Sequence, residues 1–355
     1  MRVAIDATPL SLSSGGLARY TSELSLALAR EFPEDEYSLV SDQSFALPDG
    51  ATPNLSLGCG PRTAAQSRWW LWGVYWEQRR LGTEVFHGTN FAVPYLPARP
   101  SVMTVHDLSP WLDPGSHASA GRVGRRTPWM LGLGLANMVI APSKAVRAQV
   151  VEFFRLNPGQ VVATPLAADP SFRRVATRPR ERPYFLFVGT LEPRKNLDVV
   201  MDAWRQIRHE CGVDLVLVGR RREDFPQLPP EPGLTFAGEV PDGELSGFYS
   251  GALAFVYPSL YEGFGLPVLE AMQCGVCVLT SRDEAIHEVC GDSAVRLDAR
   301  DGHAWAEAMR AVAAGGEWVP RLRASALSRA KEFSWARTAR LTRAVYQEAR
   351  RRFHG

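Results

Sequence analysis

The sequence predicts an α/β protein with two doubly wound, Rossmann-like domains. Short apolar runs rich in valine, isoleucine and leucine alternate with helical patterns, which is typical of buried parallel strands joined by crossover helices. The length of 355 residues fits two domains of about 150 residues each. A proline- and arginine-rich stretch near the middle interrupts the pattern. The 45% apolar and 22% charged residues exclude a disordered or fibrous chain.

The first half is expected to alternate strands and helices. Its strands are expected at Val3–Asp6, Tyr37–Ser41, Val85–Gly88, Val102–His106, Met138–Pro142 and Val161–Pro165. A helix is expected at Leu17–Arg30, and another should follow Ser143, a good N-cap residue, and run to about Phe154. These elements predict an N-terminal domain over residues 1–170.

The second half repeats this rhythm. Its strands are expected at Tyr184–Gly189, Val213–Gly219, Leu234–Ala237, Leu253–Tyr257, Val276–Thr280 and Ala294–Leu297. Residues 171–183 have the composition of a linker, so the second domain should span 184–333. The arginine-rich segment 334–355 predicts a helix that, at about 1.5 Å per residue, can return to the first domain. We expect a cleft between the domains at the strand carboxyl ends, where such sheets bind ligands.

The charge balance argues against a nucleic-acid partner. Forty basic and 38 acidic residues leave a net charge of +2, which provides no extended basic field. Only three of the basic residues are lysines, Lys144, Lys195 and Lys331, so each lysine is a candidate for a specific role.

The sequence also predicts a soluble, cytoplasmic protein. It begins without the apolar region of a secretory signal, and no apolar stretch reaches the 18 or so residues of a membrane span. Five scattered cysteines suit a reducing compartment. Cys274 and Cys277 form a C-x-x-C, but we expect them in the core because no second pair completes a metal site.

The segment from Pro258 to Met272 carries the strongest chemical signal. A strand ends, Gly263 and Gly265 follow, and a helix opens, so its N-terminal N–H groups can bind an anion. Glu270, one turn into the helix, is suited to hold the vicinal hydroxyls of a ribose. Eight residues of helix would separate Glu262 and Glu270 by about 12 Å, which favours two binding roles over a glycosidase carboxyl pair at about 5 to 9.5 Å. Both glutamates are expected to be buried.

The segment from Tyr184 to Leu197 predicts a cation pair at the mouth of the cleft, opposite the glycine loop. An apolar strand runs into a turn, then Arg194 and Lys195, then a helix with Asn196 as its expected N-cap. A bidentate arginine and a compact ammonium together suit a diphosphate. A simple surface pair is the alternative, which the helix dipole disfavours.

A series of motifs runs in order along nearly the whole chain: IDATPL with GGLARY, VFHGTNFAVP, TVHDLSP, APSKAV, GTLEPRKN, FAGEV, the E-x7-E run YEGFGLPVLEAM, and KEFSWARTA. This series resembles the retaining glycosyltransferases of family 4 (glycosyl transferases group 1), and in particular the mannosyltransferase-B-like branch that builds polysaccharides such as O-antigen. The resemblance implies a GT-B fold with an acceptor-side N-terminal domain, a nucleotide-sugar-binding C-terminal domain and an interdomain cleft.

The resemblance also implies roles for residues at matching motif positions. Arg194 and Lys195 should bind the donor diphosphate, and Glu270 the ribose hydroxyls. Thr190 stands where many family members have arginine, so Arg194 must supply that charge. The remaining candidates for donor, sugar or acceptor contact are Gly16 (phosphate and acceptor side), His106 (sugar), Val240 (backbone contact to the base), and Glu262 with Gly263, Phe264, Gly265 and Leu266 (transferred sugar and phosphate). The expected catalytic residues are Glu262, His106, Lys195 and Arg194.

The expected chemistry needs no metal and no resident cofactor. The sequence holds no D-x-D cluster, and Arg194, Lys195 and the helix N-terminus can stabilise the leaving diphosphate instead. The leaving phosphate can take the proton of the acceptor hydroxyl, so no side-chain base is required. His106 and Asp107 do not predict an acid/base dyad, because adjacent strand residues point to opposite faces.

The acceptor side is less defined. The segment from Trp69 to Trp76 holds five aromatic residues, and Arg122, Arg125 and Arg126 lie near Trp129. These residues could form an interfacial surface for a lipid-linked acceptor, with peripheral contact to the inner membrane. The spacing of Trp69, Trp72 and Trp76 favours one buried helix face instead.

Several alternatives stay open. GDP-mannose is the favoured donor, with UDP- and dTDP-sugars as alternatives, and the acceptor can be a glycan, a lipid-linked molecule or a small molecule. A glycosyltransferase of secondary metabolism and a non-catalytic carbohydrate- or nucleotide-binding GT-B protein are the alternative functions. A dehydrogenase is disfavoured because Ser14-Gly15-Gly16-Leu17 lacks the G-x-G-x-x-G spacing.

Overall fold

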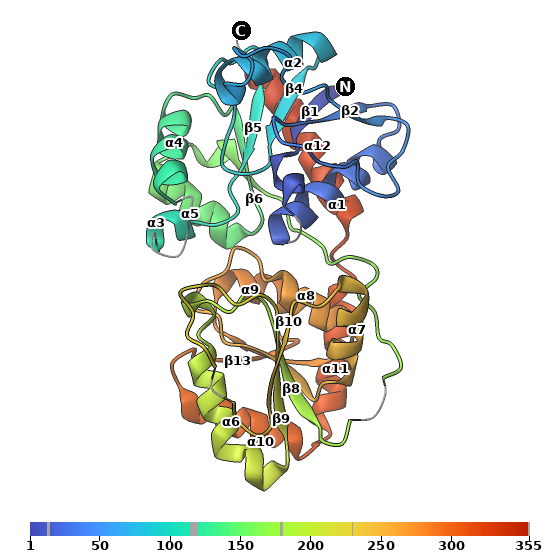
Figure 1. Cartoon of the computed structure of the whole chain (residues 1–355), viewed down its shortest axis with the longest axis vertical. Helices are drawn as coiled ribbons and strands as arrows, with labels where there is room; N and C mark the ends of the chain where they lie inside the picture. Colours follow the sequence, from blue (N-terminus) through green and yellow to red (C-terminus); the bar gives the residue numbers. More distant parts are fainter. Residues whose placement is uncertain (13–14, 114–119, 178–179, 229, 354–355) are drawn as a thin grey trace. The chain divides into compact units, whose positions relative to one another are not determined.

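The computed structural model describes residues 1–12, 15–113, 120–177, 180–228 and 230–353. The chain divides into two compact units, one of Met1–Leu166 with Ser334–Gly355 and one of Ala167–Phe333 (Figure 1). Ser14 of the predicted glycine loop, residues 178 and 179 of the predicted linker, and residues 354 and 355 lie outside the described residues. No helix in the described part of the chain is long and apolar enough to cross a membrane.

The first unit contains a seven-stranded parallel sheet in the order β3-β2-β1-β4-β5-β6-β7. The strands are β1 (Arg2–Asp6), β2 (Glu36–Val40), β3 (Leu55–Leu57), β4 (Val85–Gly88), β5 (Ser101–Thr104), β6 (Met138–Ala141) and β7 (Val161–Ala163). The α-helices are α1 (Gly16–Glu31), α2 (Val74–Leu81), α3 (Ser109–Leu112), α4 (Ala120–Gly132), α5 (Lys144–Phe154) and α12 (Trp335–Arg352). The inner strands β4, β5 and β6 are buried along their full length, as their apolar runs predict.

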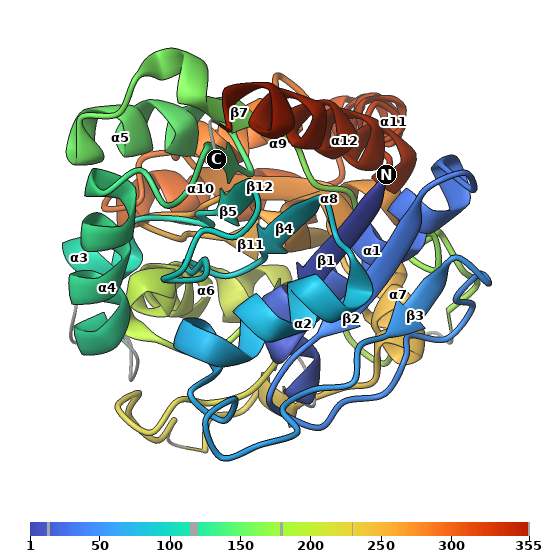
Figure 2. The ribbon, with the colours of Figure 1, turned by 90° about the horizontal axis from the view of Figure 1, so that it is seen from above.

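Helix α12 returns to the first unit after the chain has passed through the second, which confirms the predicted crossing helix. It packs against α1 and against one face of the sheet, with α2 on the other face (Figure 2). This arrangement follows from β4, because successive side chains of a strand point to opposite faces of the sheet. His87 forms a 2.8 Å hydrogen bond with Tyr346 of α12, while Phe86 packs against Trp70. Arg343 anchors the helix further by donating from Nε to Asp35 at 2.7 Å.

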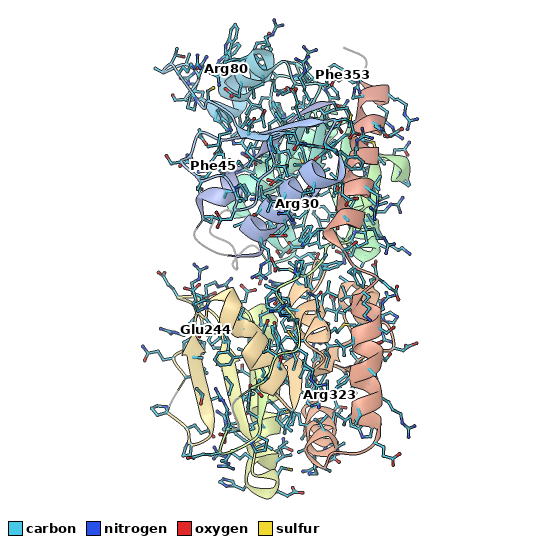
Figure 3. All side chains as sticks on the ribbon, turned by 90° about the vertical axis from the view of Figure 1, so that its right-hand side faces the viewer. Arg30, Phe45, Arg80, Glu244, Arg323 and Phe353 are labelled. Carbon is cyan, nitrogen blue, oxygen red and sulfur yellow. The ribbon has the colours of Figure 1, made fainter. Side chains whose placement is uncertain are left out.

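The second unit contains a six-stranded parallel sheet in the order β10-β9-β8-β11-β12-β13. The strands are β8 (Tyr184–Val188), β9 (Asp214–Val218), β10 (Leu234–Gly238), β11 (Ala254–Tyr257), β12 (Cys277–Ser281) and β13 (Val295–Leu297). The α-helices are α6 (Leu197–Cys211), α7 (Asp242–Gly251), α8 (Leu266–Gln273), α9 (Glu284–Cys290), α10 (Gly302–Ala313) and α11 (Trp318–Ala330). Arg323 of α11 (labelled in Figure 3) donates to the Leu253 carbonyl at 2.7 Å, just before β11 begins.

Both sheets are doubly wound, as the sequence predicts. In the second unit the strand order reverses between β8 and β11, and such a switch point opens a crevice at the carboxyl ends of the two strands. The loops that follow β8 and β11 carry the cation pair and the glycine-rich segment. The fold therefore brings these two motifs together at the carboxyl ends of adjacent central strands.

The expected linker packs along the second unit. Phe172 is fully buried and lies edge-to-face with Tyr249. Ser246 donates to the Ser171 carbonyl at 3.1 Å, and the Val175 N–H donates to Ser250 at 3.1 Å. Proline and arginine composition indicates an irregular backbone, and here that backbone is fixed by apolar and polar contacts.

The expectation that Trp69, Trp72 and Trp76 share a buried face is wrong for two of the three. Trp69 is buried, whereas Trp72 is 40% and Trp76 50% exposed. The cause is a π-helical turn over Trp69–Gly73 that precedes α2. A π-turn has more residues per turn than an α-helix, so side chains three and four apart no longer align.

Candidate functional site

A buried ion pair lies at the switch point of the second unit. Lys195, in a 3-10 turn after β8 (Pro193–Lys195), places Nζ 2.5 Å from Oε1 of Glu262, which follows β11. Lys195 is 7% and Glu262 8% exposed, whereas Lys144 and Lys331 are both exposed. The structure thus sets Lys195 apart from the two other lysines.

Two hydroxyl groups complete this ion pair. Tyr257, the last residue of β11, accepts from Lys195 Nζ at 2.7 Å and donates to Glu262 Oε1 at 3.0 Å. Ser259 donates to the same oxygen at 2.5 Å. The ammonium has three N–H donors, and partners in the described residues occupy two of them. One donor is therefore left for a ligand.

The pKa values follow from burial and charge. Burial alone would raise the pKa of Glu262, but the charges of Lys195 and Arg194 and the hydrogen bonds from Lys195 and Ser259 lower it to about 2. Burial lowers the pKa of Lys195, although the negative charge of Glu262 opposes this shift. Burial and the Glu262 charge keep Tyr257 a neutral phenol. Glu262 is therefore a carboxylate across the physiological pH range.

Arg194 lies on the other side of Glu262. Its Nη1 is 3.5 Å from Glu262 Oε2 and donates to the Tyr261 carbonyl at 2.5 Å, while its Nη2 donates to Glu192 at 2.7 Å. Arg222 reaches the same Glu192 at 3.1 Å. The cation pair is thus part of a charged network that spans the loops after β8, β9 and β11.

Asn196 does not cap α6 with its side chain, contrary to expectation. It has a positive φ of 52°, which turns the side chain away from the first turn of the helix. Its Nδ2 instead donates to the Pro258 and Ala299 carbonyls at 3.3 and 2.6 Å. The residue ties the Lys195 turn to neighbouring loops.

Glu270 is buried on α8, as expected, but has a different partner. Its Oε2 accepts from Tyr249 of α7 at 2.9 Å. Glu262 and Glu270 therefore belong to two separate polar groups, consistent with two different roles.

The glycine-rich loop leads into α8. Gly265 has a φ of 96°, and a Cβ there would lie 3.3 Å from Ile286, so this turn requires glycine. Phe264 is buried against Phe333, and Gly263 and Leu266 are half-buried. The backbone of this loop and the helix N-terminus form an electropositive end next to the Lys195 and Glu262 pair.

The two other donor candidates of this unit also lie at the carboxyl ends of the strands. Thr190 follows β8, and Val240 follows β10, and both are half-buried. The turns after β8 and β9 approach so closely that a Cβ at Gly219 would lie 2.1 Å from the Gly189 carbonyl oxygen. This close contact fixes the turn that carries Thr190.

Gly16 and His106 lie in the first unit. Gly16 is the exposed first residue of α1. His106 follows β5, donates from Nε2 to the Thr89 carbonyl at 2.7 Å and packs edge-to-face with Tyr20. Burial lowers its pKa, so the imidazole is neutral and can contact a sugar hydroxyl.

Four residues of the site were not expected from the sequence: Tyr257, Ser259, Glu192 and Asp283. Tyr257 and Ser259 stand directly beside the glycine-rich segment, so a tyrosine at the last strand position and a serine two residues later are the signal that could have revealed them. Asp283 lies 21 residues after Glu262 and comes next to it only because β12 pairs with β11, so no local pattern indicates it. Cys274 and Cys277 are buried free cysteines, as expected.

Comparisons with known proteins agree with this architecture. A family model described as glycosyltransferase family 4 matches residues 14–172, and one described as glycosyl transferases group 1 matches residues 182–314. O-antigen chain mannosyltransferase B of Escherichia coli is 31% identical over 281 residues, which cover 73% of each chain.

Solved structures show the same fold. Sucrose-phosphate synthase of Thermosynechococcus elongatus superposes with a TM-score of 0.76 at 19% identity and 98% coverage of both chains. Anabaena HepE in complex with UDP and glucose superposes with a TM-score of 0.69 at 14% identity, covering 97% of this chain and 98% of HepE. The chain belongs to the family 4 glycosyltransferases and has the GT-B fold.

Proposed function

We propose that this glycosyltransferase is a retaining, metal-independent hexosyltransferase that moves mannose from GDP-mannose to a hydroxyl of a glycan or lipid-linked acceptor. The observation that carries the proposal is the buried cluster of Lys195, Arg194 and Glu262 at the switch point of the second unit. Two cations held at a helix N-terminus suit the diphosphate of a nucleotide sugar.

The donor is held by groups from three loops, after β8, β10 and β11, and from helix α8. The remaining N–H of Lys195 and the Arg194 guanidinium bind the diphosphate, and the loop from Gly263 to Leu266 contacts the sugar and phosphate. Glu270, oriented by Tyr249, accepts from the ribose hydroxyls. Val240 contacts the base through its backbone, and Thr190 lines the diphosphate side.

The reaction exchanges one C–O bond for another on the same face of the sugar. The bond between the anomeric carbon and the phosphate oxygen breaks, and a bond to the acceptor oxygen forms. The acceptor proton passes to the leaving diphosphate, so no side-chain base is needed. Lys195 and Arg194 stabilise the charge that develops on the leaving group. Glu262 orients the sugar, and neutral His106 contacts a sugar hydroxyl.

Sugar and pathway are proposed from the relatives. The mannosyltransferase from Escherichia coli supports mannose and O-antigen or other polysaccharide assembly, whereas HepE was solved with UDP and glucose. A UDP- or dTDP-sugar is therefore the alternative donor. We place the reaction in the cytoplasm, where nucleotide sugars are made.

A peripheral membrane contact is also proposed for the first unit. Trp72 in the π-helical turn, Trp76 in α2 and Trp129 in α4 are exposed, and Arg79 of α2 and Arg125 of α4 are exposed as well. Exposed tryptophan with arginine favours the headgroup region of an anionic bilayer. In a flotation assay, the protein should rise with vesicles that contain phosphatidylglycerol. The double variant Trp72→Ala, Trp76→Ala should bind these vesicles less. Failure of the native protein to float with them would refute the contact.

The function is tested by incubating the protein with GDP-mannose, UDP-glucose and dTDP-rhamnose and measuring nucleotide release with and without a glycan acceptor. We expect release from one donor, a product that keeps the anomeric configuration of that donor (an α-linkage from GDP-mannose) by NMR, and unchanged activity in EDTA. Activity lost in EDTA and restored by magnesium would contradict metal independence. Binding without turnover of any donor would favour the non-catalytic alternative.

A further inference from the structure

A second layer of side chains holds the loop that carries Glu262. This layer comes from the end of β12, the strand next to β11. Thr280 donates to the Tyr257 carbonyl at 3.1 Å, and Ser281 donates to the Ser259 carbonyl at 2.5 Å. The two residues that bind the Glu262 carboxylate are thus themselves fixed through their backbones.

Asp283 extends this layer to Glu262 itself. Its Oδ2 accepts from the backbone N–H of Glu262 at 3.2 Å, and its Oδ1 accepts from the Ile286 N–H at 3.0 Å, which caps α9. One carboxylate therefore joins the main chain of Glu262 to the first turn of a helix.

A helix cap alone does not explain an acid at this position. Serine, threonine and asparagine cap helices about as well as aspartate. Burial, and to a smaller extent the nearby Glu262 charge, raise the pKa of Asp283 to about 6, although the N–H groups that it binds oppose this shift. A neutral cap would avoid that cost, but serine and threonine are too short to reach the Glu262 N–H as well, and asparagine has only one acceptor oxygen for the two N–H groups.

We propose that Asp283 is a positioning residue for transfer, holding the Glu262 main chain so that its carboxylate keeps one direction toward Lys195 and the bound sugar. The proposal rests on the role given above to Glu262 in the proposed function. Displacing a reacting group by about 1 Å lowers rates by about 100-fold, so loss of the hydrogen bond between Asp283 and the Glu262 N–H (the brace) should lower kcat.

The test separates the brace from the cap. Asp283→Ser keeps a cap for α9 but loses the contact with Glu262, whereas Asp283→Ala loses both. Asp301→Ala is the matched control, because Asp301 caps α10 in the same unit through an equivalent bond to the Ala304 N–H at 3.0 Å. The measurements are kcat, the KM for the donor, the Kd of the nucleoside diphosphate, and Tm.

We expect Asp283→Ser to lower kcat by roughly 10- to 100-fold, with Tm close to the native value and little change in diphosphate affinity. Asp283→Ala should lose the same activity and also Tm. Asp301→Ala should lose Tm and keep kcat. Native kcat in Asp283→Ser would overturn the proposal, as would a loss of activity in Asp301→Ala as large as in Asp283→Ser. Absence of turnover in the native enzyme would instead refute the proposed function.

Discussion

Replacing Lys195 by methionine should destabilise the second unit because it leaves a buried carboxylate without its ammonium. Methionine keeps most of the side-chain volume, so the change removes charge rather than packing. Glu262 would retain Tyr257 and Ser259 as hydrogen-bond donors and Arg194 at 3.5 Å.

The magnitude follows from the pKa of Glu262. Its value of about 2, against the usual 4.5, corresponds to about 3.4 kcal/mol in favour of the charged form at 1.36 kcal/mol per pKa unit. Lys195 is the leading favourable cause, and loss of one partner of a buried ion pair costs about 3 to 5 kcal/mol. We expect a loss of about 3 kcal/mol at pH 7, or roughly 6 to 12 °C in Tm for a domain of this size.

A double-mutant cycle with Glu262→Gln tests this reasoning. The glutamine carries no charge, so Lys195→Met should cost about 2 kcal/mol less in that background. The penalty of Lys195→Met should also shrink from pH 8 to pH 5, because burial without the lysine raises the pKa of Glu262 and lets it protonate. Calorimetric Tm and urea midpoints would measure both effects. Additive effects and a penalty independent of pH would refute the account.

Three other predictions concern single polar contacts, two in the second unit and one in the first. Tyr257→Phe should lower both Tm and transfer activity, because it removes a buried hydroxyl worth about 1 to 3 kcal/mol. The control Tyr184→Phe removes the hydrogen bond to the Phe248 carbonyl at 2.7 Å and should lower Tm alone. Equal activity in both variants would contradict a role for Tyr257. Because the pKa of Asp283 is raised to about 6, the stability it contributes is complete only below about pH 4 and is lost as the pH rises through 6. Native protein should therefore gain about 2 kcal/mol over Asp283→Asn between pH 8 and 4.5, and parallel Tm curves would contradict this. Arg343→Ala should destabilise the first unit by about 1 to 3 kcal/mol at pH 7. This difference should become smaller in acid, because the pKa of Asp35 is lowered and the stability that its carboxylate contributes is lost when it protonates. An unchanged Tm at pH 7 would show that the Arg343–Asp35 pair contributes nothing.

Most of the fold could be predicted because buried parallel strands have a strong apolar signal. Twelve expected strands correspond to strands of the structure, while β3 gave no signal because its three residues lie at the sheet edge with two side chains exposed. The exposed Trp72 and Trp76 could not be predicted because the spacing argument assumes α-helical geometry, whereas Trp69–Gly73 form a π-helical turn.

The site could be predicted only in part. Lys195, Glu262 and Glu270 stand out by residue type and position next to glycines and strand ends. The pairing of Lys195 with Glu262 could not be predicted, because the two residues are 67 positions apart and meet only when β8 and β11 lie side by side. The contact between Asp283 and Glu262 depends in the same way on the neighbouring β12.

Calorimetric titration with GDP, UDP and dTDP tests the central claim, that the cluster around Lys195 and the separate Glu270 hold a nucleotide-sugar donor. We predict that one of these diphosphates, with GDP favoured, binds the native protein, and that Lys195→Ala and Glu270→Ala each weaken binding at least roughly tenfold, which is about 1.4 kcal/mol. Unchanged affinity in both variants, or no binding of any diphosphate to the native protein, would contradict it.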